Sequence, residues 1–205
     1  MLDLNVNVYL YYYDGCTVLH SFADNSDNVE MMQLLINAGP DLVNKRTHTT
    51  GLTPLIVAAL CNNAKIVKCL LDNQTDVNLV TSEGITALRA AAQENCTETL
   101  KFLIDRLIGK PDIQGFTPLH RAEIVQCLLD KHLLHLVAAK DNTEAVGLLV
   151  QAVPQLMNTK LPEDGCTPLH LAAKHAGEAT VATMIAAGCD VHARTNDNRT
   201  PLYLA

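Results

Sequence analysis

The sequence predicts an all-α fold, a solenoid of stacked helix–turn–helix units joined by hairpin-like finger loops. A motif best written as TPLHLAA, from Thr167, recurs at spacings of 36 residues (17 to 53), 33 (53 to 86), 31 (86 to 117) and 33 (167 to 200). An apolar segment such as IVKCLLDNQ, from Ile66, follows the motif, and a Gly stands two residues before most copies of the Thr. Such a period is the signature of stacked supersecondary units.

The first segment of each unit has the features of a short helix. Thr begins the segment, where its hydroxyl oxygen can accept a hydrogen bond from an exposed N–H group of the first turn. Pro follows in four copies, and a Pro in the first turn removes no helical hydrogen bond. Paired Ala residues then allow close approach of the next unit. These residues are Pro54, Pro118, Pro168 and Pro201, with Ala58/Ala59, Ala90/Ala91 and Ala172/Ala173.

The second segment places apolar residues at helical spacing, as in Ile66, Val67 and Leu70. Gly39 and Gly188 follow two of these segments and are predicted to take the left-handed conformation that ends a helix. Glycines in the finger loops are predicted to form the tight turn that returns the chain to the next Thr. One unit cannot bury its own apolar face, so stability is expected to come from stacking. The loop glycines are Gly51, Gly84, Gly115 and Gly165.

The TPLHxAA motif, the period near 33 residues and the DVN-type step after the second segment together resemble the ankyrin repeat. The resemblance covers nearly the whole chain and implies a single ankyrin-repeat array over residues 1–205. The predicted units are 1–16 (a cap or partial repeat), 17–52, 53–85, 86–116, 117–131, 132–166, 167–199 and the partial unit 200–205.

The unit at 117–131 is too short. Its first segment ends at Ala122 and its second begins at once at Glu123, so about six residues are absent relative to the period. No Gly-containing finger loop precedes the following unit. We therefore expect residues to be missing from the sequence near 122/123 and near 131/132.

Both ends of the sequence are irregular. Residues 2–13 resemble the tail of an earlier repeat, and Ala205 stops inside a predicted helix. We expect the chain to be a fragment of a longer protein. The alternative is that Met1 is a true start and residues 1–15 form an N-terminal cap.

Composition and charge restrict the functional classes. Apolar residues make up 48% of the chain, and its formal net charge is −7. A general nucleic-acid binder needs a basic patch, so we expect no nucleic-acid partner. No apolar run approaches about 18 residues, so we expect no membrane insertion by this segment. The seven Cys show neither CxxC pairs nor zinc-site spacing and are expected to be reduced, which implies the cytoplasm, with the nucleus as a second location.

The sequence lacks the motifs of common catalytic and nucleotide-binding sites, including GxGxxG, GxxxxGK[ST], GxSxG and HExxH. Its carboxylates are scattered and form no evident acid–base couple. We therefore expect no catalytic residues, no cofactor and no metal site, and we expect that the chain is not an enzyme. His132 and His135 lie three residues apart and are the nearest approach to a metal-ligand pair. Four His follow a Leu of the repeat motif, and the ankyrin resemblance implies that they form hydrogen bonds between neighbouring repeats. They are His20, His120, His135 and His170.

The resemblance also implies where a partner binds. Ankyrin-type arrays bind on a concave face made from finger-loop tips and first helices. The matching positions lie just before each Thr and seven or eight residues after it. In the second unit they are Thr50, Leu52, Leu60 and Cys61, in the third Ser82, Glu83, Ile85, Gln93 and Glu94, and further along Glu163, Asp164, Cys166, Lys174, His175, Asn196, Asp197 and Arg199.

Four of these residues are apolar at positions expected to face solvent, namely Leu52, Leu60, Cys61 and Ile85. A contiguous exposed apolar patch usually marks an interaction site. The alternative is that these side chains pack against one another or under a finger loop. The acidic residues Glu83, Glu94, Glu163 and Asp164 are expected to form a rim that selects a partner with a basic segment.

The function predicted is that of a protein-binding module, an adaptor, scaffold or targeting segment. One alternative is a sequestering inhibitor of a transcription factor, of the inhibitor-of-kappa-B type. Another is the ankyrin segment of a larger enzyme, channel or toxin. Asn78 lies in a DVN step, where the family resemblance implies a site of asparaginyl hydroxylation, and a purely structural role in the hairpin is the alternative.

Overall fold

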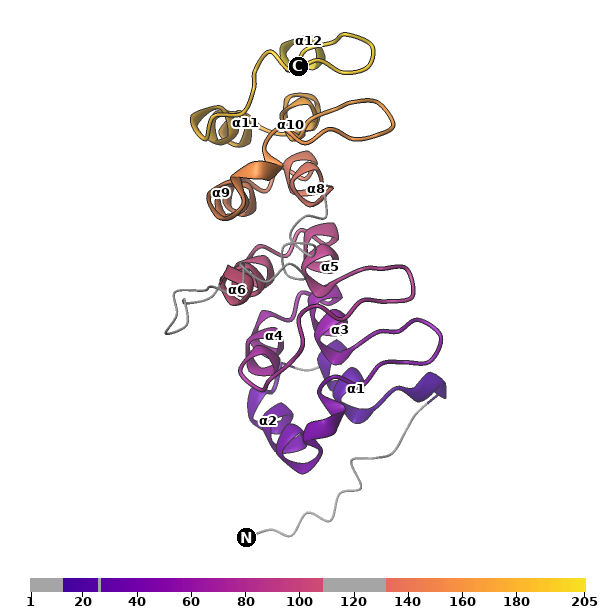
Figure 1. Cartoon of the computed structure of the whole chain (residues 1–205). Coiled ribbons are helices and arrows are strands. Elements are labelled where there is room, and N and C mark those ends of the chain that lie inside the picture. Colours follow the sequence, from indigo (N-terminus) through magenta and orange to yellow (C-terminus); the bar gives the residue numbers. More distant parts are fainter. Residues whose placement is uncertain (1–12, 26, 109–131) are drawn as a thin grey trace, which may run out of the picture. The chain divides into compact units, whose positions relative to one another are not determined.

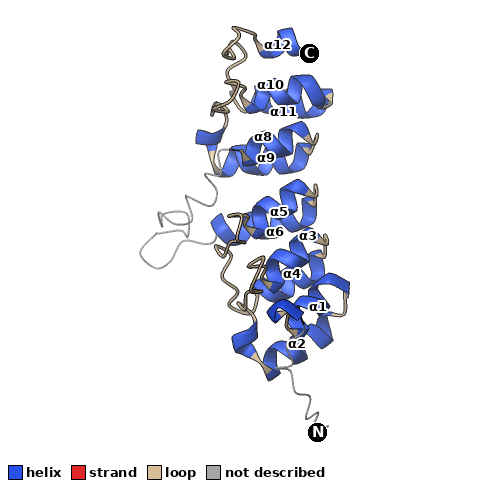
Figure 2. Ribbon diagram, turned by 90° about the vertical axis from the view of Figure 1, so that its right-hand side faces the viewer, coloured by secondary structure: helices blue, strands red, loops and turns tan. Residues whose placement is uncertain are grey.

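Short helices joined by loops make up the part of the chain that the structure, a computed structural model, describes: residues 13–25, 27–108 and 132–205. In this part the all-α prediction is confirmed, since Figure 2 draws helices and loops without a strand, and the β-type pairing of the described residues is an isolated bridge between Val80 and Thr86. The chain divides into unit 1, which ends at Glu94, and unit 2, which begins at Asn95. The expected breaks near 122/123 and 131/132 lie outside the described residues, and the boundaries of the individual repeats stay predictions.

Unit 1 is a stack of short helices in two layers (Figure 1). The first helices α1, α3 and α5 pack in that order, and the second helices α2 and α4 pack against each other beside them. These helices are 7 to 10 residues long, too short to be stable in isolation, so the stack stabilises them. The elements are η1 (Tyr13–Gly15), α1 (Val18–Asn25), α2 (Val29–Ala38), η2 (Pro40–Leu42), α3 (Pro54–Leu60), α4 (Ala64–Leu71) and α5 (Ala87–Gln93).

Unit 2 is built in the same way. Helix α10 packs between α8 and α12, and α9 packs between α6 and α11. The elements are α6 (Thr97–Ile108), α8 (Leu133–Ala139), α9 (Thr143–Ala152), η4 (Pro154–Leu156), α10 (Pro168–His175), α11 (Glu178–Ala186) and α12 (Pro201–Leu204).

The core of each stack is formed by one repeated position. A Leu stands two residues after the Thr of the repeat motif, and in four described copies its side chain is at most 2% exposed, whereas Leu202 in the last copy is 84% exposed. Full burial of a Leu side chain stabilises a fold by roughly 1.5–3 kcal/mol relative to exposure. The repeat of this Leu is therefore a repeat of the main stabilising contact. The residues are Leu19, Leu55, Leu88 and Leu169.

The predicted Thr caps are confirmed in unit 1. The Thr53 hydroxyl accepts a hydrogen bond from the Ile56 N–H at 3.3 Å, and the Thr86 hydroxyl accepts from the Arg89 N–H at 3.2 Å. Pro54 occupies the first helical turn after its Thr, as predicted. These residues fix where each first helix begins.

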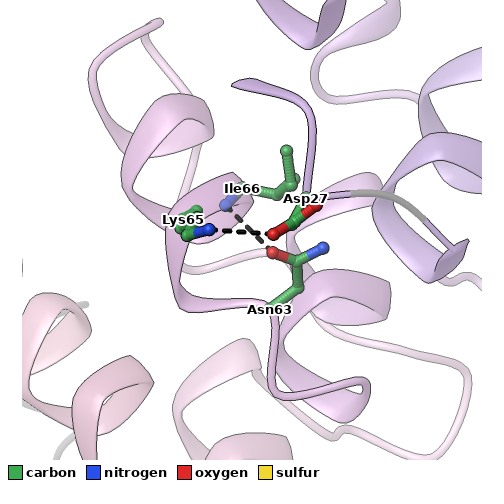
Figure 3. Close-up of polar contacts among 4 residues, drawn as sticks. All are labelled: Asp27, Asn63, Lys65 and Ile66. Atoms are coloured by element: carbon green, nitrogen blue, oxygen red, sulfur yellow. Dashed lines mark hydrogen bonds and ion pairs between the residues drawn. The ribbon is translucent and has the colours of Figure 1, made fainter.

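The second helix α4 begins with an Asn cap, which Figure 3 shows beside an ion pair. The Asn63 side-chain oxygen accepts from the Ile66 N–H at 3.3 Å, and Lys65 Nζ lies 2.8 Å from Asp27 Oδ2 (Figure 3). Both charged side chains are mostly exposed, so this pair contributes little to stability. It does join the start of α4 to the turn before α2.

The prediction for Gly39 is wrong. Gly39 ends α2 with φ −145° and ψ 73°, at negative φ rather than in the left-handed conformation. Pro40 follows it, and the ring of a Pro excludes helical conformations at the preceding residue. Gly188 is followed by Cys189 rather than by a Pro, and it has φ +95°, the left-handed conformation that was predicted.

Candidate functional site

The finger loops of unit 1, residues 44–52 and 76–85, lie side by side on the flank of the first helices (Figure 1). Their tips are joined because the Thr50 carbonyl accepts hydrogen bonds from Ser82 N–H at 2.9 Å and from Ser82 Oγ at 3.2 Å. Their bases are joined because the Asn44 side-chain oxygen accepts from the Asp76 N–H at 2.8 Å. Hydrogen bonds at both tip and base thus hold the two loops against each other.

A buried His joins the first helix of a predicted unit to the last residue of that unit, which directly precedes the Thr of the next unit. His20 Nδ1 accepts from the Thr17 N–H at 3.1 Å, and its Nε2 lies 3.0 Å from the Leu52 carbonyl oxygen on the first finger loop. Because Nδ1 accepts a hydrogen bond, it carries no proton. The ring is therefore neutral, and its proton lies on Nε2, which donates to the Leu52 carbonyl oxygen. The His therefore holds the finger loop 44–52 against α1.

The same bridge recurs in unit 2. His170 Nε2 donates to the Arg199 carbonyl at 3.0 Å, and His135 Nε2 donates to the Cys166 carbonyl at 3.0 Å. A structural role for these His is thus confirmed, although each hydrogen bond ends on the last residue of its own predicted unit rather than in the next one, and His120 lies outside the described residues. We call this arrangement the His bridge.

A groove of about 200 Å³ lies between the two finger loops of unit 1 and the end of α3. Six residues that the sequence singled out line it, together with Ile56 and Thr81. We call it the finger groove. The six residues are Thr50, Leu52, Leu60, Ser82, Glu83 and Ile85.

The floor and walls of the finger groove are apolar. Leu52 and Ile85 are half-buried, and Leu60 is 37% exposed at the end of α3. Leu52, Leu60 and Ile85 thus line one groove, as expected of an interaction patch. Leu52 and Ile85 are also partly buried, as the alternative of mutual packing expected. Glu83 is the only charged residue lining the finger groove, and it is exposed.

Other predicted residues of unit 1 lie apart from the finger groove lining. Cys61 is exposed at the end of α3, where its Sγ lies 3.0 Å from Asp24 Oδ1. Gln93 and Glu94 lie at the end of α5, with Gln93 half-buried and Glu94 exposed. None of these three lines the groove.

In unit 2 the predicted residues mainly hold the loops 158–166 and 190–199 together. The Asp164 side chain accepts from the Cys166 N–H at 2.8 Å, and this hydrogen bond lowers the pKa of the Asp164 carboxyl. The Asp164 carbonyl accepts from the Asn196 N–H at 2.8 Å. Arg199 lies 3.7 Å from Asp197 and over the Tyr203 ring. Asp164 therefore helps to hold the conformation of its loop. The sequence analysis, which placed Asp164 in an acidic rim, did not predict this role.

The remaining predicted residues of unit 2 are exposed: Glu163 in the finger loop and Lys174 and His175 at the end of α10. A second, apolar hollow of about 460 Å³ lies beside α11 and α12, next to Ile185 and Leu202. None of the residues that the sequence singled out for partner binding lines it.

Asn78 is half-buried in the second finger loop of unit 1. Its N–H donates to Asp76 Oδ1 at 2.9 Å, whereas its own side-chain oxygen is buried and has no hydrogen-bond partner among the described residues. The side chain thus does little for the hairpin backbone. Hydroxylation of Asn78 stays a prediction, and intact-peptide mass spectrometry of native protein tests it, since an unmodified peptide contradicts it.

Three features of the described residues bear on other kinds of site. They contain no group of three or more His, Cys, Asp or Glu side chains placed to hold a metal ion. None of their helices has the length and apolar character needed to cross a bilayer. None of the six described cysteines is in a disulfide, and burial raises the pKa of Cys166 and of Cys189 to about 11, so both thiols are protonated and inert at neutral pH.

Sequence reasoning missed Ile56 and Thr81. The signal for Ile56 was present, because it stands three residues after Thr53, where His20 follows Thr17 and His170 follows Thr167. Thr81 had no comparable signal. Its hydroxyl accepts from the Glu83 and Ile85 N–H groups, a contact that depends on the loop conformation.

Comparison with known proteins gives one family. A family model described as ankyrin repeats (3 copies) matches residues 2–81, 61–134 and 134–205. The nuclear factor NF-kappa-B p105 subunit of Gallus gallus is 27% identical over 88% of this chain, which spans 22% of that protein. The putative ankyrin repeat protein FPV230 of Fowlpox virus (strain NVSL) is 26% identical over 90% of this chain and 89% of its own length.

A solved structure shares the fold. It is entitled Bd0816 predatory endopeptidase from Bdellovibrio bacteriovorus in complex with immunity protein Bd3460. The match has a TM-score of 0.69 at 22% identity and covers 95% of this chain and 91% of the matched chain.

Proposed function

The chain belongs to the ankyrin-repeat family, and we propose that it is a protein–protein interaction module that holds its partner at the finger groove. The observation that carries the proposal is the groove itself. It gathers six residues that the sequence had marked for partner binding from α3 and two finger loops. A binding surface requires such residues to lie together, whereas packing of the core of the stack does not require it.

The size of the finger groove supports a protein partner. Sites for small molecules and cofactors usually measure about 300–1,000 Å³. At about 200 Å³ the groove is smaller and suits one side chain of a larger ligand. Binding energy at protein interfaces is concentrated in a few such buried anchors.

The lining of the finger groove does not suit catalysis. General acid–base chemistry usually needs two positioned titratable groups with matched pKa values. Glu83 is the single titratable residue that lines the groove. We therefore propose a binding role rather than an enzymatic one.

The test is Leu60→Glu, with Leu34→Glu as the matched control. Leu34 is 55% exposed on α2 and does not line the groove, so its replacement makes the same change of charge on another surface. Immobilised wild type and both variants are compared for the proteins they retain from an extract of the source cells. A partner should bind Leu60→Glu about thirtyfold more weakly or worse, while Leu34→Glu binds like wild type.

Circular dichroism must show equal helix content and equal thermal midpoints for all three proteins. Retention of every partner by a folded Leu60→Glu variant would refute the proposal. Loss of the partner by Leu34→Glu as well would move the binding surface away from the finger groove.

A second candidate function is sequestration of a transcription factor, of the inhibitor-of-kappa-B type. The observation in its favour is the similarity to an NF-kappa-B subunit over 88% of this chain. Co-precipitation of purified Rel-type factors tests it, and failure of all of them to bind would leave the general module. Because the chain spans 22% of that relative, an ankyrin segment of a larger enzyme, channel or toxin is the further alternative, which the mass of the parent polypeptide in source cells decides.

A further inference from the structure

The finger groove has an apolar residue at the repeat position that carries the His bridge in α1 and α10, a position that holds Arg89 in α5 and Tyr203 in α12. In α1 and α10 the position three residues after the Thr carries His20 and His170, whose Nε2 donates to the carbonyl before the next Thr. In α3 this position carries Ile56, which is 1% exposed and lines the groove. The chain has thus replaced a structural hydrogen bond by an apolar floor.

The acceptor of the missing bridge can be identified. The Leu52 carbonyl accepts from the Thr47 N–H at 2.9 Å and also from His20. The equivalent Ile85 carbonyl accepts from the Thr81 N–H at 3.0 Å, and no His of the described residues reaches it. A departure from a repeat rule that removes a hydrogen bond is expected at a functional position rather than in the structural frame.

The polar groups at the rim of the finger groove are largely engaged within the loops. The Thr50 hydroxyl pairs with the Thr47 hydroxyl at 2.8 Å, and the Thr81 hydroxyl accepts from the Glu83 N–H at 3.3 Å and the Ile85 N–H at 3.1 Å. The rim therefore offers a ligand few hydrogen-bonding groups. Recognition must rest on apolar contact and on charge.

Glu83 is the charged residue among those that line the finger groove, and the nearby Arg46 side chain donates to the Gly51 and Val80 carbonyls of the two loops. Glu83 is exposed at the rim of the groove and makes no ion pair with any described residue. The chain as a whole carries a formal charge of −7. A ligand with a basic residue beside its anchor gains from both the local carboxylate and the overall field.

We propose that the finger groove takes one aliphatic side chain of a basic peptide segment, seated on Ile56 between Leu52 and Ile85. A Lys or Arg within three residues of this anchor pairs with Glu83. The proposal rests on the proposed function, because it names the chemistry of the partner at the same groove. A whole helix is too large for a groove of about 200 Å³, which has room for one side chain.

The test is selection of random dodecapeptides displayed on phage against the full chain. Four immobilised forms are used: wild type, Leu60→Glu, Glu83→Gln and Glu30→Gln. Glu30 is exposed in the first turn of α2 and does not line the groove, so Glu30→Gln controls for the loss of one negative charge. Peptides enriched on wild type and lost on Leu60→Glu should share a Leu, Ile, Val or Met with a Lys or Arg within three residues.

Affinities of the best synthetic peptide then isolate the charge. Glu83→Gln should weaken its binding by about threefold to tenfold, and added salt should shrink this difference. Glu30→Gln should bind within about twofold of wild type. Replacing the basic residue of the peptide by Gln should abolish the effect of Glu83→Gln.

The outcomes separate the two proposals. Peptides that require Leu60 but lack a basic residue, or that ignore Glu83→Gln, overturn the partner chemistry and leave the binding module in place. Peptides that bind Leu60→Glu as well as wild type, or the absence of any Leu60-dependent peptide, overturn both.

Discussion

The finger-loop pair of unit 1 and that of unit 2 share one framework but differ in their walls. In both, an Asn side chain accepts the N–H of an Asp 32 residues further on, from Asn44 to Asp76 and from Asn158 to Asp190. In both, a basic side chain donates to a carbonyl of the second loop at 2.7 Å, Arg46 in unit 1 and Lys160 in unit 2. The two frames are therefore equivalent.

The walls are not equivalent. Where unit 1 has Leu52, Ile56 and Leu60, unit 2 has Cys166, His170 and Lys174 at the same distances from Thr. The polar set forms a His bridge to Arg199, whereas the apolar set forms the finger groove. The comparison teaches that the repeat frame accommodates either set of side chains, and that the two loop pairs differ at three positions rather than in their fold.

The variant with the largest expected effect on stability tests how closely the two loops of each pair are packed. A Cβ at Gly165 would lie 2.5 Å from Asn196 Oδ1 and 2.9 Å from its backbone nitrogen, at a φ of +75°. Gly165→Ala should therefore lower the free energy of unfolding by about 3 kcal/mol, from the left-handed conformation and the clash together. Urea unfolding followed by circular dichroism measures it.

Two further Gly variants calibrate this result. Gly51→Ala in unit 1 should cost less, because its nearest neighbour at 2.8 Å is the flexible end of Arg46. Gly188→Ala meets no described atom within 4 Å and should show the conformational cost alone, about 1 kcal/mol. Equal losses for Gly165 and Gly188 would mean that the loop contact in unit 2 is loose.

An exchange of the wall residues gives the next largest effect. His170→Ile removes the bonds to Thr167 and Arg199, and it should lower the free energy of unfolding by about 2 kcal/mol. Ile56→His should change it by less than about 1 kcal/mol, because a new His bridge to Ile85 offsets the lost apolar burial. Chemical denaturation of both variants provides the measurement.

The same two variants should rank in the opposite order when peptide binding is measured. Ile56→His replaces the apolar floor of the finger groove and should weaken the selected peptides about tenfold, whereas His170→Ile should leave their affinity unchanged. If Ile56→His destabilises the fold as strongly as His170→Ile, then the two frames are not equivalent and the comparison fails.

The smallest effect is a dependence of stability on pH from the His bridge of unit 1. Burial lowers the pKa of His20 below its ordinary value of 6.5. As the pH falls, His20 is therefore protonated at a higher pH in the unfolded chain than in the folded chain. The free energy of unfolding should consequently fall as the pH drops below about 6.5. His20→Gln should flatten this dependence between about pH 7 and about pH 5.5 in denaturation experiments.

Carboxyl groups whose pKa is lowered, such as Asp141 with its hydrogen bond from Thr180, act in a more acidic range and do not mimic this slope. A variant with His20→Gln that loses stability with pH as steeply as wild type would show that another group titrates.

Much of the fold could be predicted because its rules are local. The Thr caps, the Pro in the first turn and the buried Leu two residues after Thr each depend on a few neighbouring residues. The prediction for Gly39 failed for an equally local reason, since the effect of Pro40 on the preceding residue was not weighed. Local rules thus explain both the success and the error.

The candidate site could be predicted only in part. The positions of Leu52, Leu60 and Ile85 followed from the repeat, but their union in one groove depends on loops that are distant in sequence. Asp164 was expected to be a free acidic side chain, yet the loop geometry turns it toward the Cys166 N–H. Ile56 was missed because a buried Ile in a helix looks ordinary until it is compared with the His of the other repeats.

The most direct test of the account is a methyl NMR titration of the full chain with the best Leu60-dependent peptide. The account predicts that the methyl signals of Leu52, Ile56, Leu60 and Ile85 shift, whereas those of Leu171 and Leu202 in unit 2 do not. Shifts centred on unit 2 with the groove methyls unmoved would contradict it.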